Sequence, residues 1–460
     1  MARIFFVVWP MFASVGCGLK LARDLRSRGH DVSYLGVPDC KQFVVPHGFQ
    51  FIPLYASWLP ETPTEPPDKI ATSQTFWERF RSERARVRMV CALLDAVGSD
   101  REREFQDILT LTRPDLLIIH SCDFEVIIPS LLAYEAGIKS IYLYDNFALG
   151  EDSRVPPVTT AIVPGDGWLS SLRLRLAWKT LKIRRHIVGH IARLCGLTHE
   201  PALCRASRRI ADRCGYPWEL VEPTEAVLLK AHLPEIILCP RELEFIREER
   251  PGRYYLGCNI DLQRQEADFP WNLLGSRRLI YCSLGTVSWF DKATYQRFFQ
   301  VILDVAATKS TFQWVISLYD VVNPEDFANV PSNVLLVKRA PQLALLRRCV
   351  IAIVHGGGNT TKECAYFGVP MVVFPLGLDQ PGNAARVVYH GLGVRGDFSS
   401  VTADQMSALV DRVDRDSFFQ MQARLMGERL RAADIGRSAV DFVEKLLSTP
   451  KVEKLLSARG

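Results

Sequence analysis

The sequence predicts an α/β protein made of two halves, each alternating strands and helices around a largely parallel sheet. The chain has 460 residues, 48% of them hydrophobic. A single core stops growing near about 250–300 residues, so at least two domains are expected. Apolar runs of strand length also recur between helix-length segments in both halves. We expect domains at residues 1–250 and 251–460, because a polar stretch of mixed charge begins at residue 251.

The first half opens with a strand, a helix and a second strand, which together form one β-α-β unit. We expect the strand at residues 4–9, a loop at 10–16, the helix at 19–28 and the second strand at 31–35. Gly29 follows the helix, where glycine suits the left-handed residue that ends it. The later elements are expected to be strands at 115–120, 140–144 and 235–239, a helix at 127–136 and loops at 150–167.

The second half repeats this alternation. Its strands are expected at 278–283, 312–318, 334–337, 350–354 and 370–374. Its helices are expected at 296–308, at 343–348, after the glycines at 356–358, and at 404–413, 416–432 and 436–447. In open α/β sheets, ligands bind beyond the carboxyl ends of the strands. We therefore expect the functional residues in the loops that follow these strands.

The most informative motif spans residues 355–363 and reads His-Gly-Gly-Gly-Asn-Thr-Thr-Lys-Glu. It joins an apolar strand to a helix, and a strand, a glycine turn and a helix start form an anion cradle with free backbone N–H groups. His355 adds a donor near the phosphates. Asn359 and Glu363 are four residues apart and share one helix face, where a carboxylate suits the hydroxyls of a ribose. The motif alone predicts a nucleotide diphosphate ligand.

At these residues the sequence resembles the nucleotide-sugar glycosyltransferases of the inverting UDP-glycosyltransferase type, among them bacterial macrolide and natural-product glycosyltransferases. The donor motif of that family runs from Ala-Pro-Gln through His-x-Gly-x-Asn-Ser/Thr-x-x-Glu to Asp-Gln. The matching residues here are Ala340, Pro341, Gln342, His355, Gly357, Asn359, Thr360, Glu363, Asp379 and Gln380. The resemblance implies the GT-B fold, with two facing Rossmann-like domains, the active site in the cleft and a last helix that packs back on the first domain.

The resemblance also implies a role for each donor-site residue. It assigns His355, Asn359 and Thr360 to the pyrophosphate, and Glu363 to the ribose. It assigns Asp379 and Gln380 to the hydroxyls of the transferred sugar. It assigns Gly285 and Thr286 to a second phosphate-side loop, and the Ala340 backbone and Gln342 to the base. Arg339 stands where a base-stacking Trp is usual, so the base, uracil or thymine, stays open.

The acceptor side departs from the family pattern at both members of its catalytic pair. Members typically carry a His general base in the first loop, held by an Asp after a later strand. Here Ser14 stands at the His position and His120 at the Asp position. Three alternatives remain open. His120 is the base with Ser14 as its partner, or Asp123 is the base, or neither is needed, because the acceptor is acidic enough to react with little help or the protein is not a catalyst.

Aromatic residues cluster in the loops near the first strands. Phe12, Trp58 and Phe147 are our candidates for acceptor contacts, although each could instead belong to the core. Their number favours an apolar acceptor with a hydroxyl group.

The net charge of +5 is unevenly distributed, because residues 172–213 carry eleven Lys or Arg against two acidic residues. Ile183, Ile187, Ile191 and Leu194 form one helical stripe within this segment. The segment is either a solvated helix whose stripe faces the core, or a face that touches an anionic membrane or a lipid-like acceptor. No aromatic or glycine pattern of a nucleic-acid-binding module accompanies the charge, which argues against a nucleic-acid partner.

The expected activity is transfer of a hexose from a UDP- or dTDP-sugar to a hydroxyl of an apolar small molecule. The family chemistry implies neither a metal ion nor a cofactor. The twelve cysteines include no Cys-x-x-Cys, so we expect reduced thiols. We expect a cytoplasmic or membrane-peripheral protein, because Pro10 interrupts the apolar segment at residues 4–19, which argues against a signal peptide, and no run of 18 apolar residues appears elsewhere. Two alternatives remain open: a nucleotide-sugar epimerase, and a non-catalytic nucleotide-sugar-binding partner protein.

Overall fold

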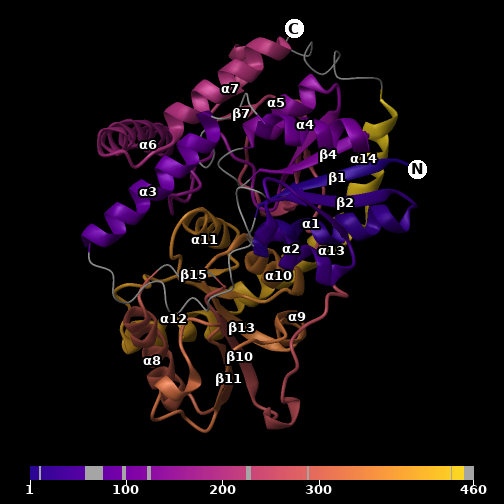
Figure 1. Ribbon diagram of the computed structural model, residues 1–460. Helices are drawn as coiled ribbons and strands as arrows, with labels where there is room; N and C mark the ends of the chain where they lie inside the picture. The colour runs from indigo at the N-terminus through magenta and orange to yellow at the C-terminus, as the bar shows by residue number, and fades with distance from the viewer. Residues whose placement is uncertain are drawn as a thin grey trace.

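Two α/β domains lie one above the other in the view of Figure 1, which shows a computed structural model of the chain. The structure describes residues 1–9, 12–56, 76–95, 100–121, 126–223, 229–286, 290–436 and 438–449. Each domain is built on one parallel sheet that is covered by helices. The prediction of an α/β protein with two parallel sheets is confirmed.

The N-terminal sheet has seven strands in the order β3-β2-β1-β4-β5-β8-β9. They are β1 (Arg3–Val8), β2 (Asp31–Gly36), β3 (Gln50–Pro53), β4 (Leu116–His120), β5 (Lys139–Tyr144), β8 (Glu235–Ile237) and β9 (Arg253–Tyr255). Every residue of β4 is buried, as expected for a central strand of a sheet covered on both faces. The strand order changes direction between β1 and β4, so the loops after these two strands border one crevice.

The C-terminal sheet has six parallel strands in the order β12-β11-β10-β13-β14-β15. They are β10 (Arg278–Ser283), β11 (Phe312–Ser317), β12 (Val334–Val337), β13 (Cys349–Val354), β14 (Met371–Val373) and β15 (Gly393–Arg395). Here the order changes direction between β10 and β13. The loops after β10 and β13 therefore border a second crevice, which belongs to the predicted donor site.

The helices divide between the two domains. Those before the C-terminal sheet are α1 (Phe12–Ser27), α2 (Lys41–Val44), α3 (Phe76–Asp95), α4 (Asp100–Thr112), α5 (Ile127–Glu135), α6 (Trp168–Cys195) and α7 (Glu200–Cys214). Those that follow are α8 (Lys292–Thr308), α9 (Gln342–Leu346), α10 (Gly358–Phe367), α11 (Gln380–Tyr389), α12 (Ala403–Arg415), α13 (Ser417–Gly436) and α14 (Ala439–Ser448). The strands β6 (Val221–Glu222) and β7 (Lys230–Ala231) form a small antiparallel pair.

The last helix, α14, leaves the C-terminal domain and packs on the N-terminal one, where it appears in yellow beside β1 and β2 (Figure 1). Its buried residues Val440 and Val443 join the core cluster that contains Ile4 and Phe6 of β1. The ammonium of Lys139 donates to carbonyl groups at the end of this helix, including that of Leu447 at 2.7 Å. The chain thus ties its two domains together at its own C-terminal end.

A buried ion pair also joins the two domains. The guanidinium of Arg386 on α11 binds the carboxylate of Glu244, which lies before β9, with Nε 2.8 Å from Oε1. Both side chains are at most 2% exposed. The guanidinium also lies 4.0 Å from the ring centre of Phe147 and 4.4 Å from that of Phe245. The cation is therefore fully enclosed between the domains.

The structure corrects three details of the predicted elements. The loop expected at residues 10–16 is wrong, because α1 already begins at Phe12. Gly18 in α1 brings the helix close to β1, since a Cβ there would lie 3.3 Å from the ring of Phe6. The first sheet extends past residue 250, because β9 pairs with β8. The stripe containing Ile187 does not face the core, since Ile187 is 53% exposed.

We predict that Arg386→Ala destabilises the protein by about 3 kcal/mol, because it leaves a buried carboxylate without its main partner. Arg247 also contacts Glu244 and keeps the loss at the low end of the usual range. The shift of the urea unfolding midpoint measures this effect. Arg424→Ala, which removes an exposed pair with Glu428, is the control and should cost about 0–1 kcal/mol. Equal shifts for the two variants would contradict the prediction.

Candidate active site

The residues predicted for the site lie at the two points where strand order reverses. In the C-terminal sheet, Gly285 follows β10 and His355 follows β13. In the N-terminal sheet, α1 follows β1, and His120 is the last residue of β4. These are the positions at which doubly wound sheets bind ligands. The predicted residues therefore lie at the carboxyl ends of the strands in both sheets.

The imidazole of His355 is packed between two glycine backbones. A Cβ at Gly285 would lie 2.7 Å from Nε2 of His355, and a Cβ at Gly357 would lie still closer. Gly285 also has φ of +81°, which only glycine adopts readily. Both positions thus require glycine for the ring to fit. Burial lowers the pKa of His355 to about 4, against a weaker opposing effect from the backbone of Ser283. The ring is neutral near pH 7.

The helix α10 begins directly after this turn and presents its N-terminus to the crevice. Its first backbone bond runs from Thr361 N–H to Gly357 O, at 2.9 Å. The N–H groups of Gly358, Asn359 and Thr360 come before that bond and have no acceptor within the helix. Asn359 is half-buried and Thr360 is buried. The turn therefore offers the N–H donors and the positive helix end that bind an anion.

Asp379 and Gln380 behave differently from each other. One oxygen of Asp379 accepts bonds from the amides of Asn383, at 2.7 Å, and of Asn146 from the other domain. Burial, followed by the nearby charge of Asp145, raises the pKa of Asp379 to about 6. The side chain of Gln380 is buried and caps its own turn, with Oε1 accepting from Leu376 N–H at 2.7 Å.

Glu363 is held by two partners, one of which the sequence reasoning missed. The amide of Gln342 donates to Oε2 of Glu363 at 2.6 Å. The two residues, which the resemblance assigns to the base and the ribose of one nucleoside, are therefore neighbours. Arg264, from the segment between the sheets, reaches both carboxylate oxygens, at 2.5 and 3.2 Å. In the same segment, Glu266 accepts from the backbone N–H groups of Leu343 and Ala344 at the start of α9. The interdomain segment thus occupies the predicted nucleoside subsite.

The remaining donor-side residues line the same region. Ala340 is half-buried, just before α9, and Thr286 is exposed after β10. Arg339 is exposed and lies 3.4 Å from a carboxylate oxygen of Asp320. Its guanidinium therefore has an acidic neighbour at the position where the family usually has a base-stacking Trp.

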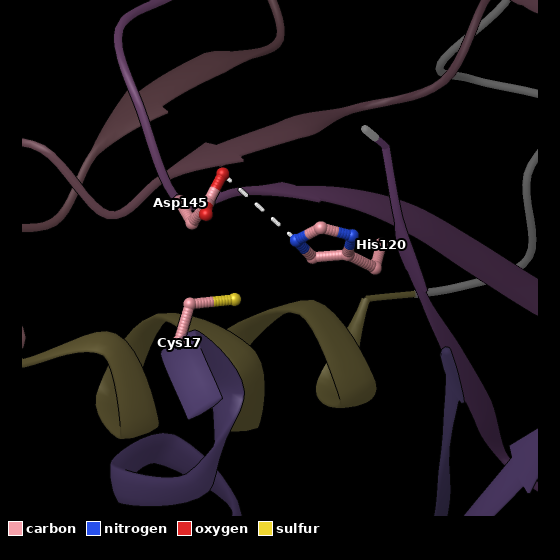
Figure 2. A group of neighbouring side chains, drawn as sticks. All are labelled: Cys17, His120 and Asp145. Atoms are coloured by element: carbon pink, nitrogen blue, oxygen red, sulfur yellow. Dashed lines mark ion pairs between the residues drawn. The ribbon is translucent and has the colours of Figure 1, made fainter. Parts of the chain in front are cut away.

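On the acceptor side, three side chains from separate elements meet, as Figure 2 shows. They are Cys17 on α1, His120 at the end of β4 and Asp145 just after β5. Nε2 of His120 lies 3.9 Å from Oδ1 of Asp145. The side chain of His120 is 2% exposed, whereas that of Asp145 is 15% exposed. Asp145 is therefore the more exposed member of this pair.

The same three residues are the group that could hold a metal ion in the described part of the chain. Their ligand atoms, one sulfur, one nitrogen and one oxygen, all lie within 4.8 Å of one another. Such a donor set suits zinc. Burial raises the pKa of Cys17, while His120 acts in the opposite direction. The thiol therefore favours its protonated form, so a metal ion would have to displace that proton.

The structure does not place the remaining predicted acceptor-side residues at the site. Asp123 and Trp58 lie outside the described residues, and so do the side chains of Phe12 and Ser14. Phe147 is 1% exposed and packs under Arg386. Its ring is part of the domain interface, so the structure gives it no open face for an acceptor.

Asp145 and Arg264 are the site residues that sequence reasoning missed. Asp145 follows a predicted strand, and a search for polar residues after every strand would have found it. Arg264 carries no such signal, because it lies in an irregular segment and meets Glu363 across 99 residues of sequence.

Comparison with known proteins finds sequence relatives of this chain. Residues 305–440 match the family model "Erythromycin biosynthesis protein CIII-like, C-terminal domain". An uncharacterized UDP-glucosyltransferase, YojK of Bacillus subtilis, is 20% identical over 446 residues, covering 96% of this chain and 97% of that protein. The family match covers the segment that contains His355, Glu363 and Asp379.

Solved structures share the fold over nearly the whole chain. The glycotransferase of kitacinnamycin has a TM-score of 0.67 and 22% identity, covering 97% of this chain and 99% of the other. The glycosyltransferase VinC in complex with dTDP has a TM-score of 0.61 and 16% identity, and each chain is covered completely. These similarities confirm the predicted GT-B fold.

Proposed function

We propose that this protein, which has the GT-B fold, is a glycosyltransferase of the natural-product type that transfers a hexose from a UDP- or dTDP-sugar to a hydroxyl of an apolar small molecule. The observation that carries the donor half is the His355 turn with the N-terminus of α10 behind it. The turn would hold the diphosphate with backbone N–H groups. The dTDP complex of VinC supports a nucleotide diphosphate ligand for this fold.

The leaving group would be stabilised without a metal ion or a cofactor. Negative charge would develop on the β-phosphate as the bond to the sugar breaks, and the N–H groups of Gly358 and Asn359 at the start of α10 would stabilise it. Because His355 is neutral, its contribution is a single N–H donor and not a full positive charge. The helix N-terminus would therefore supply most of the stabilisation. Transfer would proceed by direct displacement, with inversion at the anomeric carbon.

The acceptor hydroxyl would lose its proton to the His120–Asp145 pair. Asp145 follows β5, and its neighbour Asn146 contacts Asp379 of the predicted donor site. This contact brings the pair close to the predicted position of the sugar. His120, buried behind Asp145, would orient the carboxylate and share the incoming proton. The pair thus replaces the family arrangement, in which the His lies on the first loop and the Asp after β4.

Two alternative functions, a nucleotide-sugar epimerase and a non-catalytic binding partner, can be distinguished from a transferase by experiment. An epimerase would release no nucleoside diphosphate in response to an acceptor, whereas a transferase would. A binding partner protein would take up the donor without turnover over a wide acceptor panel. Mass spectrometry of a reaction with several nucleotide sugars and a host extract, searching for an added hexose, is the direct test of the proposal.

We predict that His355→Ala lowers donor affinity or kcat/KM for the donor at least about tenfold, because the phosphate loses a fixed donor and the two glycine backbones lose their packing partner. Isothermal titration with UDP and dTDP, together with donor kinetics, measures the effect. His390→Ala on α11 serves as the control, since His390 contacts the backbone of Glu244 and not the turn. Unchanged donor affinity and kinetics would remove the phosphate role.

We predict that Asp145→Asn lowers turnover about 100-fold or more while donor affinity is retained, because a positioned base contributes roughly 10²–10⁴ in rate. His120→Ala should lower turnover less, since it acts through Asp145. Assays run with EDTA should keep full activity. Wild-type turnover by both variants would eliminate the pair as the base, and loss of activity with EDTA would show that the group holds a metal.

We predict that Arg264→Ala tightens donor binding about threefold or more. Arg264 occupies the carboxylate of Glu363, so the ribose must displace it, and removing a competing state raises apparent affinity. Arg264→Lys, which keeps the charge but loses the two-point contact, should fall between wild type and Ala. Weaker donor binding by Arg264→Ala would instead show that Arg264 orients Glu363 for the ribose.

A further inference from the structure

The helix α6 carries a stripe of large apolar side chains that points away from the protein. The stripe is defined by Leu172, Leu176, Ile183, Ile187, Ile191 and Leu194. Their exposed fractions run from 41% for Leu172 to 76% for Leu194. Helical periodicity, at about 100° per residue, places all six on one side of the helix. A stripe of this length is unusual on a protein surface that faces only water.

The opposite side of α6 anchors the helix to the protein. Leu174 and Trp178 are its buried residues, and Nε1 of Trp178 donates to Val155 O at 2.8 Å. Both lie in the first half of the helix. In the second half, no residue is buried. α6 therefore rests on the N-terminal domain by one face and presents the apolar stripe with the other. In Figure 1, α6 lies at the outer edge of that domain, away from the sheet.

The stripe is flanked by positive charge on both sides. The 28 residues of α6 include seven Lys or Arg and no Asp or Glu. Arg173 and Arg184 flank one side of the stripe, and Lys179 flanks the other. Two further cations are neutralised locally, because Lys182 pairs with Glu151 at 2.6 Å and Arg193 with Glu200 at 3.2 Å. Arg173, Lys179 and Arg184 have no acidic partner within the described residues.

From this combination we propose that α6 docks the protein on an anionic lipid surface. An apolar stripe between rows of cations is the arrangement by which a helix lies in the plane of a membrane, with its stripe among the acyl chains and its cations at the headgroups. A second copy of the chain fits this face less well, since pairing two stripes would bring two rows of unpaired cations together. Within the described residues, no helix is long and apolar enough to cross a membrane.

This inference does not depend on the proposed sugar transfer. It does connect with the acceptor side, because α6 belongs to the domain that contains His120 and Asp145. An apolar acceptor dissolved in the membrane would then be close to the protein that modifies it.

Co-sedimentation of the full chain with lipid vesicles tests the proposal. We expect binding to vesicles of phosphatidylglycerol and phosphatidylcholine that is at least tenfold tighter than binding to pure phosphatidylcholine, and that weakens as salt is raised. Ile183→Glu combined with Ile187→Glu should reduce binding at least tenfold. Leu111→Glu combined with Leu273→Glu is the matched control, since both residues are exposed apolar side chains away from α6.

A variant that removes two cations tests whether the positive charge of α6 contributes to vesicle binding. Arg173→Ala combined with Arg184→Ala should weaken binding to the anionic vesicles, and Arg424→Ala combined with Arg429→Ala on α13 should not. Circular dichroism and dTDP binding establish that each variant is folded. Equal binding to neutral and anionic vesicles, or no binding to either, would overturn the proposal. A dimer of the wild-type chain that the Ile183→Glu, Ile187→Glu variant disrupts, without vesicle binding, would assign the stripe to a second copy.

Discussion

The site depends on how Lys362 joins the two domains. This lysine lies on α10, one turn after the His355 turn, and its side chain is buried. Its ammonium donates to Asp145 O at 2.8 Å and to Leu238 O at 2.7 Å, both beyond strand ends of the N-terminal sheet. A buried cation is tolerated only when such acceptors are fixed around it. The donor helix is therefore held against the loop that carries the acceptor-side carboxylate.

The segment that joins the two sheets contacts the predicted nucleoside-binding residues. This segment lies beside the domains held at Lys362, and its residues Arg264 and Glu266 contact Glu363 and the start of α9. Glu363 would otherwise be a buried carboxylate without a cation, which is costly. Arg264 thus already pairs with the carboxylate of Glu363, and in the proposed function the ribose hydroxyls would have to replace a charged partner with neutral ones.

The sequence predicted the features formed by neighbouring residues and missed those formed by segments that are distant in the sequence. The donor motif is continuous, so its spacing alone fixed the strand, the turn and the helix around His355. The pair of His120 and Asp145 comes from two strands, and no spacing rule joins them. The stripe of α6 had the right periodicity, but periodicity cannot tell a core face from an exposed one, because that depends on which other elements pack there. Similarly, no local signal shows that residues 253–255 add an edge strand.

The neutral state of His355 follows from the same close packing that positions it. The backbones of Gly285 and Gly357 pack on the ring, and burial depresses its pKa. A protonated ring would attract the diphosphate more strongly, but it would hold the substrate and the departing nucleotide about equally well. Stabilisation that increases only as charge develops is more useful to a transferase. A fixed N–H beside a helix N-terminus meets this requirement, since its dipoles are oriented before the bond breaks.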